Sequence, residues 1–144
     1  EGHSWATVRG YTFMAWLCCK DVSENVESPD EDAVKEGIES TVEQGLFSWV
    51  TDDGKGIIAS IARNLIAVRV SSGRKDECIV FDYELATDSW MHIAITHVPP
   101  RTLSASIIKL HIDGKLEGQE KLKFPKVGDN LRFVGLGTGY VVDD

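Results

Sequence analysis

Short apolar stretches recur along most of the chain, and the alternation of apolar and polar positions within them indicates β-strands rather than helices. Turn-forming residues separate the stretches, and the pair Asp113-Gly114 is the strongest hairpin signal. The strands are predicted over residues 11–17, 45–50, 56–61, 65–70, 78–83, 90–98, 106–112, 116–122 and 131–134. Short strands at this spacing are typical of an all-β fold in which two antiparallel sheets form a β-sandwich.

Two of the predicted strands are apolar on both faces. Residues 11–17 read YTFMAWL and residues 90–97 read WMHIAITH, and successive side chains of a strand point to opposite sides. Such strands are expected to lie buried between two layers. We interpret His92 as a packed, hydrogen-bonded framework residue. His97 is expected to be exposed, because it lies at the strand end beside Pro99-Pro100.

The net charge of -8 is concentrated in one segment, residues 21–43, which holds nine acidic residues and one lysine. Almost no large apolar side chain is present there to offset the entropy of ordering the backbone, so the segment is predicted to be a flexible acidic loop. A short helix over residues 31–38 is the alternative, because Ser28-Pro29-Asp30-Glu31 can begin one. Residues 1–144 are predicted to form a single domain, with this loop inserted after the first main strand.

Four segments occur in an order that resembles a known family: GYTFMAWL, SWMHIAITH, IIKLHIDGKLEGQEKL and LRFVGLGTG. Over residues 10–139, apart from the acidic segment, the chain resembles the concanavalin A-like (laminin G-like) jelly roll. Within that superfamily it resembles the version found in BEACH-domain proteins such as neurobeachin and the beige-like proteins. The resemblance implies a non-catalytic protein-interaction or scaffold module of a large BEACH-type protein that acts in vesicle or lysosome-related membrane trafficking. The implied partners are a protein or neighbouring domains of the same chain, and the implied location is cytoplasmic, peripheral to endomembranes.

Other members of the superfamily hydrolyse or bind glycans, but the residues for that chemistry are not evident. Glycoside hydrolysis needs two carboxylates on one strand face, whereas the nearest acidic cluster, residues 27–32, contains a proline and lies in the acidic segment. Asp52-Asp53-Gly54 is typical of a turn rather than of a calcium loop. The histidines and the adjacent Cys18 and Cys19 lack zinc-ligand spacing. We predict no catalytic residue, no metal site and no cofactor.

A group of lysines on and after the Asp113-Gly114 hairpin is a candidate binding site: Lys109, Lys115, Lys121, Lys123 and Lys126. Most of these lysines are explained as side chains on solvent-exposed strand faces. Lysine also protects exposed sheet edges from aggregation. The alternative is contact with an anionic partner, either an acidic protein segment or phosphoinositide headgroups of a membrane. Nucleic-acid binding is not expected, because the chain is acidic overall and lacks a basic face with interleaved aromatic residues.

A carbohydrate-binding lectin or laminin G-like module is the alternative function. It requires an aromatic platform and polar side chains that converge on one sheet, commonly with calcium, and glycan binding is less expected than protein binding. An odd number of cysteines and the lack of an Asn-x-Ser/Thr sequon favour a reducing, cytoplasmic setting. No stretch of about 20 residues is apolar enough to predict a membrane-spanning helix.

Overall fold

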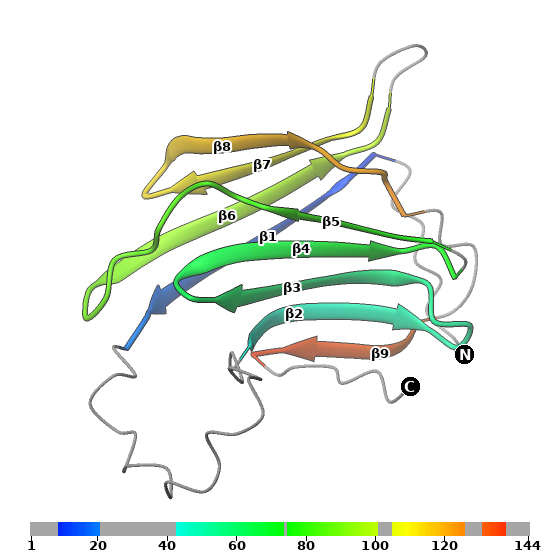
Figure 1. Ribbon diagram of the computed structural model, residues 1–144, viewed down its shortest axis with the longest axis horizontal. Coiled ribbons are helices and arrows are strands. Elements are labelled where there is room, and N and C mark those ends of the chain that lie inside the picture. Colours follow the sequence, from blue (N-terminus) through cyan, green and yellow to red (C-terminus); the bar gives the residue numbers. More distant parts are fainter. Residues whose placement is uncertain (1–8, 21–42, 74, 101–104, 126–130, 138–144) are drawn as a thin grey trace, which may run out of the picture.

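The computed structural model describes residues 9–20, 43–73, 75–100, 105–125 and 131–137, which form two antiparallel sheets (Figure 1). The strands in these ranges are β1 (Tyr11–Cys18), β2 (Gln44–Thr51), β3 (Gly56–Ala62), β4 (Leu65–Ser71), β5 (Asp76–Val80), β6 (Trp90–Val98), β7 (Ile107–Ile112), β8 (Lys115–Lys121) and β9 (Leu131–Leu136). A four-stranded sheet has the order β1-β6-β7-β8, and a five-stranded sheet has the order β5-β4-β3-β2-β9. The predicted all-β, two-sheet sandwich is confirmed.

Most predicted strands agree with the structure to within one or two residues, and β6 matches its predicted bounds. The strand predicted over residues 78–83 is shifted, because Phe81 leaves the sheet edge and turns its ring into the core, where it is 1% exposed. The Phe81 N–H still donates to the carbonyl of Ile66, at 2.9 Å. The acidic segment predicted over residues 21–43 lies outside the described residues, apart from Glu43.

The hairpin predicted at Asp113-Gly114 joins β7 to β8, and both residues have positive φ, as a tight two-residue turn requires. Asp113 also ties this turn to β6. Its N–H donates to the carbonyl of His92, and its Oδ1 accepts from the N–H of His92, both at 2.8 Å. The hairpin is therefore anchored to the middle of the four-stranded sheet.

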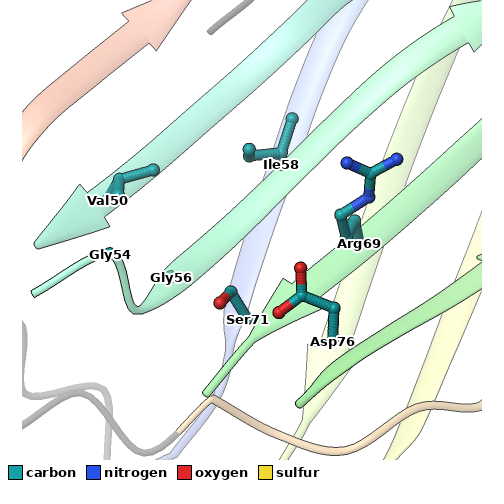
Figure 2. Close-up of a pocket in the computed structure, with 7 residues that line it drawn as sticks. All are labelled: Val50, Gly54, Gly56, Ile58, Arg69, Ser71 and Asp76. Atoms are coloured by element: carbon teal, nitrogen blue, oxygen red, sulfur yellow. The ribbon is translucent and has the colours of Figure 1, made fainter. Parts of the chain in front are cut away.

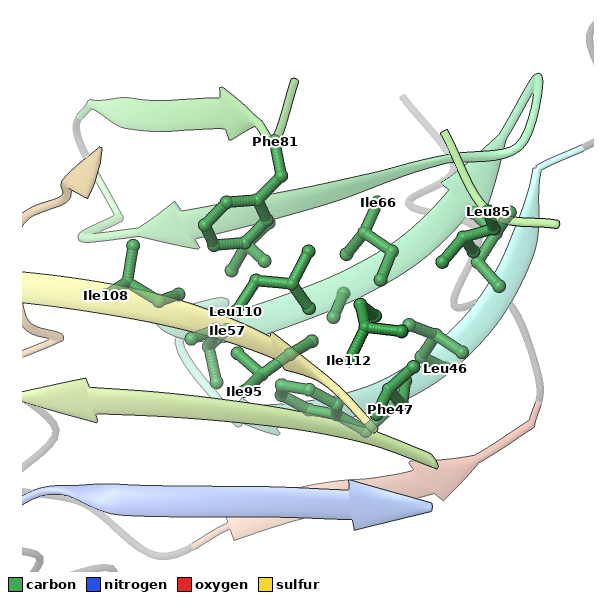
Figure 3. Close-up of a cluster of buried hydrophobic side chains, with 14 of the residues drawn as sticks. Leu46, Phe47, Ile57, Ile66, Phe81, Leu85, Ile95, Ile108, Leu110 and Ile112 are labelled. Atoms are coloured by element: carbon green, nitrogen blue, oxygen red, sulfur yellow. The ribbon is translucent and has the colours of Figure 1, made fainter. Parts of the chain in front are cut away.

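The core fills the space between the two sheets (Figure 3). The five-stranded sheet contributes alternate side chains such as Phe47, Ile57 and Ile66, and the four-stranded sheet contributes Ile95 and Ile108. Each of these side chains is fully buried. Burial of one such side chain stabilises the fold by about 1.5–3 kcal/mol, so these positions account for why the two sheets stay together.

Aromatic side chains connect β1 to β2 across the layers. The ring centroids of Phe13 and Phe47 are 4.7 Å apart, and those of Tyr11 and Trp49 are 5.2 Å apart. β1 is the last strand on its side of the four-stranded sheet, whereas β2 is followed by β9 in the other sheet. The edge strand β1 therefore packs against β2, and the edge strand β9 of the other sheet lies beyond it.

Candidate functional site

Large apolar side chains gather on the outer side of the β1–β6 pair. Trp16 lies opposite His92 in the strand register, Met14 lies opposite Ala94, and Trp90 pairs with the end of β1. Directly paired residues of antiparallel strands project to the same side. The side chains of Met14, Trp16, Trp90, His92 and Ala94 therefore share one surface, here called the aromatic face.

The prediction that β1 and β6 are buried on both sides was wrong. Met14 is 63% exposed, Trp16 is 64% exposed and Trp90 is 70% exposed. Their sheet is one of two layers, so only its inward face contacts the other sheet. Apolar residues on the outward face therefore face solvent in the described part of the chain.

Side-chain contacts order the aromatic face. The rings of Trp16 and His92 meet edge-on, with centroids 5.4 Å apart and planes inclined at 64°. His92 is half-buried at this contact, and its backbone is fixed by the Asp113 hydrogen bonds. Ala94 separates Met14 on β1 from His111 on β7 in the same row of the sheet. The paired backbones of β1 and β6 thus present indole, thioether and imidazole groups on one surface.

Four of the five lysines predicted as an anionic contact lie in the described residues. Lys109 lies opposite Thr96, and Lys121 lies opposite Ile107, so both project to the outer side of the sheet that carries the aromatic face. Lys115 Nζ lies 2.7 Å from Glu117 Oε1, and this hydrogen bond raises the pKa of Lys115. Lys123 follows β8, and Lys126 lies outside the described residues. Lys109 and Lys121 therefore lie on the same side of the sheet as the aromatic face.

His97 is fully buried, so the prediction that it is exposed was wrong. Side chains of β6 alternate between the two sides of the sheet, and the His97 side chain points inward. The residues around it supply polar partners. Nδ1 lies 3.1 Å from the Tyr11 hydroxyl, and Nε2 lies 2.8 Å from Ser106 Oγ and 3.0 Å from the carbonyl oxygen of Leu122. The His97 side chain therefore links β1, β6 and the segment after β8.

The partners of His97 define which nitrogen carries its proton. The Leu122 carbonyl can only accept, so Nε2 donates, and Ser106 Oγ uses its own hydrogen for the Val98 carbonyl at 3.0 Å. Nδ1 is then the acceptor for the Tyr11 hydroxyl. Burial lowers the pKa of His97 below its ordinary value and raises that of Tyr11, which favours the neutral form of both groups.

A small hollow lies on the outer side of the five-stranded sheet (Figure 2). Its volume is about 140 Å³, and Figure 2 shows Arg69 and Asp76 among the residues around it. Pockets that bind small ligands usually measure about 300–1,000 Å³. The hollow is therefore a weaker candidate than the aromatic face.

No group of three His, Cys, Asp or Glu side chains in the described ranges is arranged to hold a metal ion. The same ranges contain no helix with the length and apolar character needed to cross a bilayer.

Comparison with known proteins gives two kinds of similarity. No protein-family model matches the chain. The chain is 27% identical over 135 residues to BEACH domain-containing protein B of Arabidopsis thaliana, covering 93% of this chain and 4% of that protein. It is 29% identical over 82 residues to BEACH domain-containing protein lvsE of Dictyostelium discoideum, covering 57% of this chain and 4% of that protein. The chain thus spans a small fraction of the relatives it matches.

The solved structures resemble the chain in fold. The botulinum neurotoxin type G receptor binding domain superposes with a TM-score of 0.56 at 16% identity, over 90% of this chain and 31% of that one. A second structure of the serotype G binding domain gives the same TM-score, over 91% of this chain and 30% of that one. At this identity the likeness concerns the β-sandwich alone. The chain is therefore a β-sandwich similar in sequence to a short segment of BEACH domain-containing proteins.

Proposed function

We propose that residues 1–144 form a single, non-catalytic, concanavalin A-like interaction domain of a large BEACH-type protein. The domain holds a neighbouring domain of the same polypeptide through the aromatic face, and the protein acts in membrane trafficking in the cytoplasm, at the surface of endomembranes. The observation that carries this proposal is the exposure of Met14, Trp16 and Trp90 side by side on one sheet. Similarity to segments of two BEACH domain-containing proteins supports it.

Physical chemistry favours contact at the aromatic face. Exposed apolar groups that adjoin one another commonly mark interaction sites, and tryptophan is among the residues that contribute most to binding. The Trp16 side chain is positioned by its contact with His92, and the backbone beneath it is paired along the whole of β1. Little conformational entropy would be lost when a partner covers these rings.

The charge around the aromatic face indicates the chemistry of the partner. Lys109 and Lys121 project on the same side of the sheet, beyond the β6 rows. An apolar segment with acidic residues on its rim would satisfy both the tryptophans and the lysines. If the lysines instead bind a membrane, the double variant Lys121→Glu and Lys123→Glu is expected to bind more weakly than the parent to liposomes that contain phosphoinositide.

The proposal is tested by titrating residues 1–144 against the remainder of the same polypeptide. Replacement of both Trp16 and Trp90 by alanine is expected to weaken association by tenfold or more, which is about 1.4 kcal/mol. Val80→Ala is the matched control, because Val80 is an exposed apolar residue on the other sheet. Equal affinity of the double variant and the control would contradict the proposal.

Glycan binding is the second candidate, and the exposed tryptophans are the observation that favours it. Indole faces stack on sugar rings, and His92 adds a polar group beside Trp16. A glycan panel with and without calcium separates the two functions. Reproducible sugar binding that is lost in the double tryptophan variant would assign the aromatic face to a glycan instead of a protein.

A further inference from the structure

The outward face of the four-stranded sheet differs between its two ends. The aromatic face lies at one end. At the other end, the register places Thr12 of β1, Thr96 of β6 and Lys109 of β7 in a single row across three neighbouring strands (Figure 1). Trp16 and Thr12 are four residues apart on β1, so their Cα atoms are separated by about 13 Å at the rise of a strand. One end of the face thus presents aromatic groups, and the other presents hydrogen-bond donors.

Two threonine hydroxyl groups lie side by side in this row. Thr12 Oγ1 and Thr96 Oγ1 are 3.3 Å apart, and either oxygen can be the donor of the hydrogen bond between them. Each hydroxyl group carries one hydrogen, and the bond between the two groups uses only one of these hydrogens. The second hydrogen can therefore be donated to an acceptor that approaches the sheet from outside.

A hollow of about 210 Å³ adjoins the threonine pair. Arg9 and Gly10 line it together with Thr12 and Thr96. A Cβ atom added at Gly10 would lie 2.6 Å from the carbonyl oxygen of His97, and Gly10 has a φ of 113°, so a larger residue would be strained at this position. The close approach of the Gly10 backbone to β6 holds Arg9 beside the hollow.

The charged side chains described at this end of the sheet are cations. Lys109 pairs with Gln119 on β8, and Lys121 pairs with Ile107 in the next row, so the paired residues of these two rows include no acid. In the described part of the chain, neither Arg9 nor Lys109 forms an ion pair. Positive charge therefore gathers here although the net charge of the chain is -8. We call the cations and hydroxyl groups at this end the donor cluster; its members are Arg9, Thr12, Thr96 and Lys109.

We propose that the donor cluster binds a phosphate monoester carried by a side chain of the protein segment that covers the aromatic face. The presence of that segment rests on the function proposed above, whereas the phosphate is inferred from the donors themselves. A guanidinium, an ammonium and a hydroxyl hydrogen match the three terminal oxygens of a phosphate, and two cations balance its charge of about -2 at pH 7. A carboxylate has one charge and two oxygens, so it would leave one cation without a partner.

The position of the donor cluster favours a protein over a lipid as the source of the phosphate. The tryptophans and the donors project from one side of the same sheet, so the partner must present apolar groups and a phosphate side by side. A folded protein surface can do so. In a bilayer, by contrast, the phosphates lie in the headgroup layer, outside the apolar core that would receive the tryptophans.

The phosphate site is tested by NMR titration of the full 144-residue chain at low salt, with O-phosphoserine in one arm and acetate in the other. Saturable shifts of the Thr12 and Thr96 amide resonances are expected with phosphoserine, at a dissociation constant about fivefold or more below that for acetate. Absence of a saturable shift with phosphoserine, or equal affinity for acetate, would overturn the proposal.

A double variant tests the two cations. Arg9→Gln with Lys109→Gln is expected to weaken phosphoserine binding by about fivefold or more. Arg69→Gln with Lys75→Gln is the matched control, because it makes the same change of charge at two exposed residues in and beside the five-stranded sheet. Equal affinity of the two double variants for phosphoserine would overturn the proposal.

Two further arms separate the phosphate site from the proposed function and from a lipid. Replacement of both Trp16 and Trp90 by alanine is expected to leave phosphoserine binding unchanged. If the parent associates with the rest of its polypeptide through these tryptophans but does not bind phosphoserine, the phosphate site alone is overturned; phosphoserine binding without that association would overturn the proposed function. Vesicles that contain phosphatidylinositol phosphate are the last arm, and binding to them that is lost in Arg9→Gln with Lys109→Gln would assign the site to a lipid and overturn the proposal.

Discussion

The two faces of β6 use similar residues for different purposes. On the inward face, Ile93, Ile95 and His97 are completely buried, and they contact the opposite sheet or bind the segment after β8. On the outward face, Trp90 is mostly exposed and His92 packs its ring against Trp16. One strand thus holds the sandwich together and also presents the proposed binding surface. Residue type alone does not distinguish these roles, because both faces contain apolar groups and a histidine.

The largest expected difference between the faces is a loss of stability on the inward side. Ile95→Ala removes buried methyl groups and leaves a cavity between the sheets, so the free energy of unfolding is expected to fall by about 2–5 kcal/mol. Thr96→Ala is the outward control and is expected to cost less than about 1 kcal/mol. Urea denaturation of both variants measures the comparison, and equal losses would mean that the faces are not energetically distinct.

His97 tests whether the buried network stabilises the inward face. His97→Leu removes the donor to the Leu122 carbonyl, and a buried acceptor that loses its hydrogen bond costs about 1–3 kcal/mol. The outward counterpart His92→Leu is expected to change the free energy of unfolding by less than about 1 kcal/mol. A His97→Leu protein as stable as the parent in urea would show that the network contributes nothing net.

The pH dependence of stability should report the burial of His97 on the inward face. Burial lowers the pKa of His97 in the folded state below 6.5, so the unfolded chain binds the proton more readily. Stability is therefore expected to fall as the pH drops below about 6.5 and to level off below the folded pKa, with a slope of at most about 1.4 kcal/mol per pH unit. His97→Leu should flatten this region of a melting-temperature profile. A profile unchanged by His97→Leu would contradict the assignment.

The fold could be predicted from the sequence because its signals are local. Alternation places the strands, and the Asp113-Gly114 pair specifies a tight turn whose positive φ angles only a few residues adopt easily. The shift of β5 could not be predicted in the same way. Phe81 leaves the strand because a space exists under Gly118 of β8, which is a contact between residues distant in sequence.

The candidate site was predicted less well, for a related reason. Alternation correctly separates Trp90 and His92 from Met91 and Ile93, but it does not say which side another layer will cover. An apolar outward face has the same pattern as a buried one, so the exposed tryptophans were interpreted as core. Sequence alone also does not give the faces of the β7–β8 hairpin on which the lysines lie, because the register shifts after Leu110. The lysine contact therefore stays a prediction.

The smallest expected effect on stability concerns the outward face. Trp90→Ser removes a side chain that is 70% exposed, so the free energy of unfolding is expected to change by less than about 1 kcal/mol, measured by urea denaturation. Its effect on the proposed association with a neighbouring domain should be larger than its effect on stability, because a partner bound at the aromatic face would cover the indole ring. The inward neighbour Met91→Ser supplies the reverse pattern: Met91 is 4% exposed, so its loss should destabilise the sandwich while the surviving folded protein binds as the parent does. If Trp90→Ser instead unfolds the protein and leaves the affinity of the folded fraction unchanged, the outward face belongs to the framework and the proposed division of β6 into two faces is wrong.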